Sequence, residues 1–115
     1  MGAWTTWRKI AEGNHWFDDQ LDWDGPACYE LGIGGPRGGG IKRVYVGETT
    51  SESRRVIAYA SSGSHLWDII DWHLKRGWCL FYRAQVKRSK RAAVRAQDNL
   101  LAKFDYDWNI KLNSQ

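Results

Sequence analysis

The chain has 115 residues, of which 43% are hydrophobic and 26% are charged, and its formal net charge is +4. This length and composition fit one globular domain and exclude a disordered or fibrous chain. The two cysteines exclude a disulfide framework and a four-cysteine zinc site, and no apolar run is long enough to cross a membrane. We therefore expect a single-domain protein of a reducing, cytoplasmic compartment.

The first part of the chain, residues 1–24, is expected to be an N-terminal extension, and residues 25–115 are expected to form the domain proper. Apolar side chains at helical spacing predict a short amphipathic helix over residues 4–11. Gly13 and Asn14 would end this helix, because both residues are typical of helix termini and turns.

The rest of the chain alternates between β-prone and helical segments. The predicted elements are a strand over 27–33, a glycine-rich connection over 32–40, a strand over 42–47, helices over 49–60 and 65–76, a strand over 78–86, and a helix from the cap Ser89 to about residue 104. This β-β-α-α-β-α order predicts an α/β fold, in which a small, mainly antiparallel three-stranded sheet is flanked by helices.

Basic residues are concentrated in the second half of the chain. Eight lysines and arginines, and no acidic residue, lie between Lys75 and Arg95. A block of one sign produces a local positive potential that favours a polyanion such as nucleic acid. The alternative is a solvated helix end that only keeps the protein soluble, and charge alone does not separate the two.

The last predicted helix carries one polar residue on its apolar side. Gln97 shares a helical stripe with Ala93, Leu100, Leu101 and Phe104, and this stripe should face the sheet. A polar group on that face costs free energy unless it is paired or lines a cleft, or unless it lies at the edge of the stripe and reaches water.

Four further polar residues need a common explanation. Tyr29 and Tyr45 lie in the two hairpin strands, and Arg55 and Tyr59 are spaced to share one face of the helix that follows. Each has an ordinary structural explanation when taken alone. Together with Gln97 they would form a cluster in which phenols relay a proton and a guanidinium binds a phosphate.

These residues resemble the GIY-YIG nuclease superfamily over roughly residues 25–112. The two signature strands correspond to Ala27-Cys28-Tyr29 and Tyr45-Val46-Gly47, and the family arginine corresponds to Arg55, ten residues after Tyr45. Tyr59 stands where the family has His or Tyr, and Asn109 matches its late asparagine. The metal-binding glutamate, twelve residues before that asparagine, corresponds to Gln97.

The resemblance implies a DNA endonuclease that hydrolyses phosphodiester bonds with one divalent ion, Mg²⁺ or Mn²⁺. It implies Tyr29 as general base, Tyr45 and Tyr59 as groups that hold water and phosphate, and Arg55 as an electrostatic clamp. Gln97 departs from the family, because an amide is a poor ligand for Mg²⁺, and Asp98 points about 100° away round the helix. We favour an inactivating Glu-to-Gln substitution over a naturally silent binding module.

Candidate DNA-binding residues lie in the loops and in the basic block, and duplex is expected rather than single-stranded DNA. They are Arg37, Lys42, Arg43, His65, Lys87, Arg88, Lys90, Arg91 and Asn109. The glycine-rich connection with Arg37 is the candidate for insertion into a groove. A rival interpretation is a protein-interaction domain, in which Trp16, Trp23 and Trp67 form an exposed apolar patch.

Overall fold

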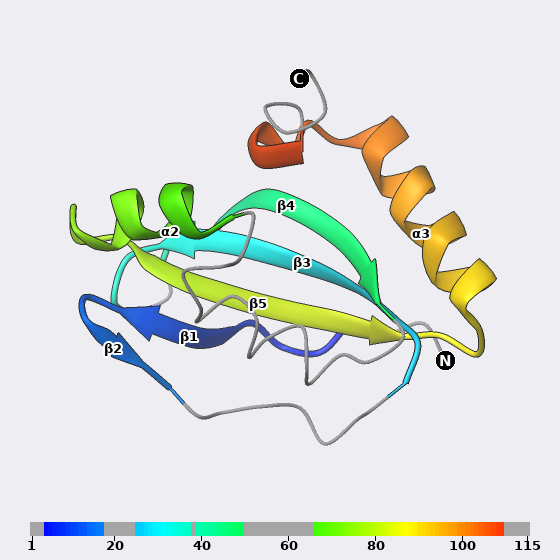
Figure 1. Cartoon of the computed structure of the whole chain (residues 1–115), viewed down its shortest axis with the longest axis horizontal. Helices are drawn as coiled ribbons and strands as arrows, with labels where there is room; N and C mark the ends of the chain where they lie inside the picture. The colour runs from blue at the N-terminus through cyan, green and yellow to red at the C-terminus, as the bar shows by residue number, and fades with distance from the viewer. Residues whose placement is uncertain (1–3, 18–24, 38, 50–65, 110–115) are drawn as a thin grey trace.

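Seven strands and helices are seen in the computed structural model, which describes residues 4–17, 25–37, 39–49 and 66–109 (Figure 1). In chain order they are β1 (Arg8–Glu12), β2 (His15–Trp16), β3 (Ala27–Gly34), β4 (Lys42–Thr49), α2 (Trp67–Leu74), β5 (Cys79–Val86) and α3 (Lys90–Lys103). The strands form one antiparallel sheet in the order β2-β1-β5-β3-β4. In the helix predicted over 49–60, with a cap at Thr49, Thr50 or Ser51, Thr49 is the last residue of β4 and the rest lies outside the described residues. No described helix is long and apolar enough to span a membrane.

Strand β3 lies between β4 on one side and β5 on the other. All eight of its residues are buried, as expected for a strand with neighbours at both edges and helices nearby. The predicted β3–β4 hairpin is present. In its glycine-rich turn the Gly35 amide donates to the Gly39 carbonyl, and Gly40 has a φ of +66°, which favours glycine.

The N-terminal segment differs from its prediction, because residues 8–12 form a strand and not a helix. β1 pairs with β5, places Ile10 and Ala11 in the core, and turns into β2 at Gly13, which has a φ of +59°. A segment this short forms only a marginally stable helix, whereas pairing with the edge of β5 gives its backbone hydrogen bonds in the sheet. The predicted three-stranded sheet is therefore wrong, and the sheet has five strands.

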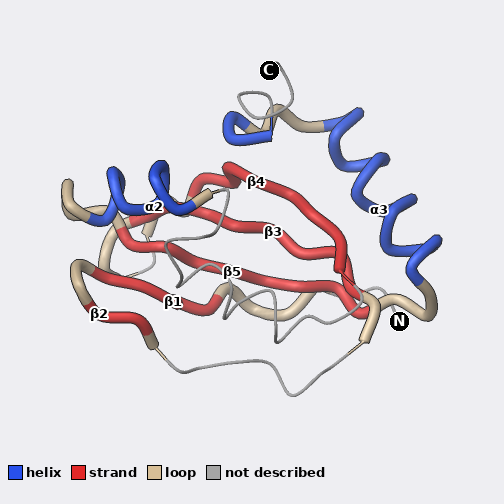
Figure 2. Tube along the Cα trace, viewed as in Figure 1, coloured by secondary structure: helices blue, strands red, loops and turns tan. Residues whose placement is uncertain are grey.

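Side chains alternate between two faces of the sheet, and each face has its own core. The tyrosine face carries Tyr29, Leu31 and Tyr82, which pack with Ile70 and Leu74 of α2. On the α3 face, Cys28, Val46 and Tyr106 pack with residues of α3. Figure 2 shows α2 near the end of the sheet where β5 starts and α3 near the end where β5 stops.

The predicted cap of α3 is present, since the Ser89 hydroxyl accepts a hydrogen bond from the Ala92 amide at 3.1 Å. The helix runs to Lys103, close to its predicted end. The helix predicted over 65–76 is shorter in the structure, where α2 spans Trp67–Leu74. Gly77, which has a φ of +90°, follows the end of this helix.

A buried carboxylate organises the α3 face. Glu30 is fully buried, and one of its oxygens lies 2.7 Å from both Nε and Nη2 of Arg83, which stands opposite it on β5. The Tyr106 hydroxyl donates a hydrogen bond to the other oxygen, and Nε of Arg43 lies 3.7 Å from that oxygen. Such a carboxylate is stable only while these partners replace the water it has lost.

Aromatic rings hold the arginines of this network in place. The Arg83 guanidinium lies 4.6 Å from the ring centroids of Trp4 and of Trp7, and that of Arg43 lies 4.3 Å from the centroid of Phe104. Burial, and then the hydrogen bond to Glu30, raise the pKa of Tyr106 above its ordinary value. The Tyr106 hydroxyl is therefore a donor at all ordinary pH values, and its contribution to stability is lost only in strong alkali.

The Glu30→Gln variant should be strongly destabilised. Removing one partner of a buried ion pair leaves an uncompensated arginine, which costs about 3–5 kcal/mol of unfolding free energy. Urea unfolding followed by tryptophan fluorescence measures this loss. Tyr106→Phe is the matched control, because it removes one hydrogen bond to a charged group and should cost less, about 1.5–3 kcal/mol. A Glu30→Gln protein as stable as the parent would show that the network does not organise this face.

Candidate active site

Two tyrosines of the predicted site lie next to each other on the sheet. In the β3–β4 register, Tyr29 stands opposite Gly47 and Leu31 stands opposite Tyr45, so the two tyrosines are diagonal neighbours on the tyrosine face. Their ring centroids are 6.1 Å apart and the rings are tilted by 41°. Each phenol can both donate and accept hydrogen bonds. Tyr29 is 2% exposed and belongs to the core of this face, whereas Tyr45 is half-buried at its margin.

Gly47 fixes where the Tyr29 phenol lies. A Cβ atom at this position would lie 2.5 Å from the Tyr29 hydroxyl and 2.6 Å from its Cζ atom, closer than any side chain allows. The ring of Tyr29 therefore crosses from β3 over the backbone of β4. The glycine of Tyr45-Val46-Gly47 is required by this close approach and not by a turn.

Asn109 is bonded to the middle residue of the same motif. Its Oδ1 accepts from the Val46 amide at 2.8 Å, and its Nδ2 donates to the Val46 carbonyl at 2.9 Å. Asn109 is only 7% exposed, and its amide satisfies the outer edge of β4. The contact of Asn109 in the structure is therefore a structural one, and its contact with DNA stays a prediction. Lys42, also expected to bind DNA, pairs with Asp107 at 2.9 Å.

Gln97 is half-buried on α3, which contacts β4 and β3. The apolar residues beside it, Leu100 and Leu101, pack with Cys28 and Val46 on the α3 face, which is opposite to the tyrosine face. The structure therefore brings Tyr29 and Tyr45 together and places the helix of Gln97 against the other side of their strands.

Among the described residues, no group of three His, Cys, Asp or Glu side chains could hold a metal ion.

Three predicted site residues, Arg55, Tyr59 and His65, lie outside the described residues. Cys28, which precedes Tyr29, is buried, and burial raises the pKa of its thiol to about 12. A thiol with so high a pKa is neutral at physiological pH and takes no part as a nucleophile.

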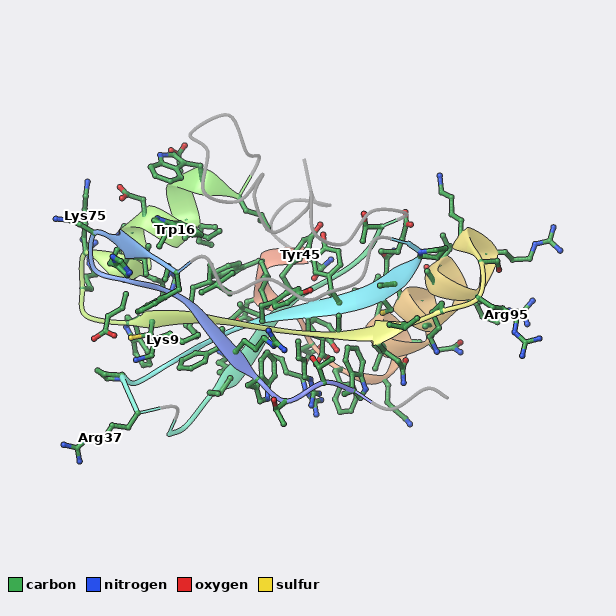
Figure 3. All side chains as sticks on the ribbon, turned by 90° about the horizontal axis from the view of Figure 1, so that it is seen from below. Lys9, Trp16, Arg37, Tyr45, Lys75 and Arg95 are labelled. Atoms are coloured by element: carbon green, nitrogen blue, oxygen red, sulfur yellow. The ribbon has the colours of Figure 1, made fainter. Side chains whose placement is uncertain are left out.

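The basic block is not one surface, because β5 divides it. Eight residues of strand span about 26 Å, so Lys75 and Arg95 lie at opposite ends of the molecule (Figure 3). At the first end, Lys75 pairs with Asp71 at 2.9 Å and Arg76 stacks on Trp72 at 3.7 Å, while Arg83 inside the strand binds Glu30. Only the second half of the basic block therefore remains as one continuous basic surface.

This second half, the α3-end cluster, consists of basic residues between the end of β5 and the second turn of α3. Its members are Lys87, Arg88, Lys90, Arg91 and Arg95, all of them exposed or half-exposed. Arg37 is exposed in the glycine-rich turn, but Figure 3 places it at the other end of the molecule. Arg43 is held by Glu30 and Phe104. The α3-end cluster is thus the part of the predicted DNA surface that the fold leaves together.

Sequence reasoning missed the Glu30 network. A signal was present, because Glu30 and Arg83 are charged residues inside segments that otherwise read as buried strands. Buried charges are rare unless they are paired, so opposite charges in two such strands indicate an ion pair between the strands. Their pairing requires the β3–β5 register, which only the structure supplies.

Gly47→Ala should destabilise the protein by about 1–3 kcal/mol, because the new methyl group has to displace the Tyr29 phenol. Gly39→Ala is the matched control, since a Cβ there meets nothing within 4 Å and φ is not positive. Urea unfolding of both variants measures the difference. Equal stability of the two would mean that Tyr29 does not lie over β4.

Comparison with known families gives one result. The family model described as "GIY-YIG domain-containing protein" matches residues 21–115. No curated protein and no solved structure matches the chain. The match includes both strands of the tyrosine pair, the helix of Gln97 and the asparagine that holds Val46. The chain therefore belongs to the GIY-YIG domain family.

Proposed function

We propose that this protein is a DNA endonuclease that hydrolyses phosphodiester bonds, in a form in which Gln97 replaces the metal-binding glutamate of the family. Membership of the GIY-YIG family supports a nuclease-type fold, since these domains are generally metal-dependent endonucleases. The observation that carries the proposal is the tyrosine pair, with Tyr29 held over Gly47 and Tyr45 beside it. With Gln97 at this position, the chain cleaves DNA slowly or not at all.

In this proposal, the tyrosine pair positions and deprotonates the attacking water molecule. Tyr29, acting as the phenolate, accepts the proton of the water and becomes the neutral phenol, and Tyr45 holds the water or a phosphate oxygen by a hydrogen bond. Arg55 and Tyr59 complete the assignment from the sequence pattern, with the guanidinium stabilising charge on the phosphate in the transition state. Asn109 contributes indirectly, because it holds the strand segment between Tyr45 and Gly47.

The described residues do not fit a divalent ion. Mg²⁺ and Mn²⁺ require anionic oxygen ligands, whereas Gln97 offers one neutral oxygen, and no acidic cluster lies in the described part of the chain. The assignment of Gln97 to the metal position rests on its spacing from Asn109 alone, because α3 packs on the face of β3 and β4 opposite to Tyr29 and Tyr45.

A second candidate function is a catalytically silent DNA-binding module of the same fold. The α3-end cluster favours it, because five basic side chains bind phosphates without any metal. The two functions share the same DNA surface and differ only in whether a carboxylate at position 97 restores chemistry.

Gln97→Glu should create Mg²⁺-dependent nicking of a plasmid where the parent chain gives little. The carboxylate supplies a full negative charge and two acceptor oxygens in place of an amide. Single catalytic electrostatic groups commonly contribute ~10²–10³ in rate, so the gain should be at least of that size. A nicking assay with and without Mg²⁺ or Mn²⁺ measures it.

The control is the double variant Gln97→Glu, Tyr29→Phe, which should bind DNA normally in EDTA and cleave none. Equal inactivity of the parent and Gln97→Glu, over duplex and single-stranded substrates and several divalent metals, would exclude the endonuclease and leave the binding module.

Replacing Lys87, Arg88 and Arg91 by Ala should weaken DNA binding by a similar factor on unrelated sequences. It should also reduce the salt dependence by about one slope unit for each lost phosphate contact. The matched control replaces Lys9, Lys42 and Lys75, which removes the same charge from lysines paired with Glu12, Asp107 and Asp71. Fluorescence anisotropy at several salt concentrations compares the two triple variants. Equal losses would assign the binding to net charge and not to the α3-end cluster.

A further inference from the structure

A cavity of about 480 Å³ lies against α2, and the proposed chemistry makes no use of it. Asp68, Ile69, Trp72 and His73 line it. Asp68 and Trp72 are four residues apart and so share one side of the helix, as do Ile69 and His73. The volume is within the range of ligand sites, which is roughly 300–1,000 Å³.

Trp72 gives the cavity a flat aromatic wall. Its side chain is among the exposed large hydrophobic groups of the protein, at 50% exposure. The Arg76 guanidinium lies 3.7 Å from the centroid of the ring and donates to the Trp72 carbonyl, but Arg76 does not line the cavity. The arginine therefore braces the indole from outside the cavity.

The polar side chains of the cavity are those of His73 and Asp68. Nδ1 of His73 lies 2.8 Å from the Ile69 carbonyl, and because a carbonyl only accepts, this nitrogen carries the hydrogen and is engaged within the helix. Asp68 is exposed and forms no ion pair among the described residues, unlike Asp71, which pairs with Lys75.

A planar ligand with adjacent N–H donors matches these groups. Among the natural bases only guanine has two neighbouring donors on its Watson–Crick edge, N1–H and the 2-amino group, and these fit the two oxygens of one carboxylate. Adenine and cytosine place an acceptor beside their donor, which the carboxylate would repel. We propose that this cavity binds an unpaired guanine, stacked on Trp72 and held by Asp68.

One lining residue contacts the segment that holds β4. The His73 ring lies 5.4 Å from that of Trp108, and the next residue, Asn109, holds Val46 between Tyr45 and Gly47. Resting on the proposed action on DNA, the inference makes the substrate a DNA that carries an unpaired guanine.

The test uses DNA hairpins of identical stem whose loop carries guanine, hypoxanthine or adenine among thymines, with affinity measured by fluorescence anisotropy in EDTA. Hypoxanthine lacks only the 2-amino group, so the guanine loop should bind about tenfold more tightly. Asp68→Asn should remove this preference, and Trp72→Ala should weaken guanine-loop binding roughly tenfold. Trp78→Ala is the matched control, since Trp78 is 43% exposed and lies outside the cavity.

Equal affinity for the three loops, or a guanine preference that survives both Asp68→Asn and Trp72→Ala, would overturn this inference and leave the endonuclease proposal standing. Binding of no hairpin at all would overturn both. Because Asp68 and Trp72 are exposed, both variants should fold, and urea unfolding verifies this.

Discussion

The ion pair between Glu30 and Arg83 is the interaction on which one whole face of the domain depends. It joins β3 to β5, and Glu30 also binds Tyr106 from the segment after α3. Because a buried carboxylate must be paired, the positions of β5, Tyr106 and the rings of Trp4 and Trp7 are fixed together. A polar network of this kind specifies a unique arrangement on a face whose apolar cluster is small.

This arrangement also determines which side chains lie on the tyrosine face. Since β3 alternates, holding Glu30 and Cys28 on the α3 face directs Tyr29 and Leu31 to the other one. Close packing then decides the position of the phenol, because Gly47 leaves room for it over β4 and Asn109 pins the adjacent residue. Three positions of the family signature thus act together as one geometric unit.

Charge and aromatic surface are distributed to different ends of the sheet. The end at which β5 starts carries the exposed Trp72 and Trp78, with Lys75 paired to Asp71 and Arg76 stacked on Trp72. The end at which β5 stops carries the α3-end cluster. In the proposed function, the α3-end cluster would attract DNA without regard to sequence, and the aromatic surface would select the base.

The sequence by itself determined the features that depend on neighbours along the chain. These are the β3–β4 hairpin with its glycine-rich turn, the Ser89 cap of α3, and the spacing of Tyr29, Tyr45 and Asn109 that indicates the family. The tertiary structure decided that residues 8–12 form a strand, that the basic block divides, and that Glu30 is buried with partners 53 and 76 positions away. Local propensity and periodicity act over a few residues, while strand pairing and burial of charge are settled by residues that meet only when the chain has folded.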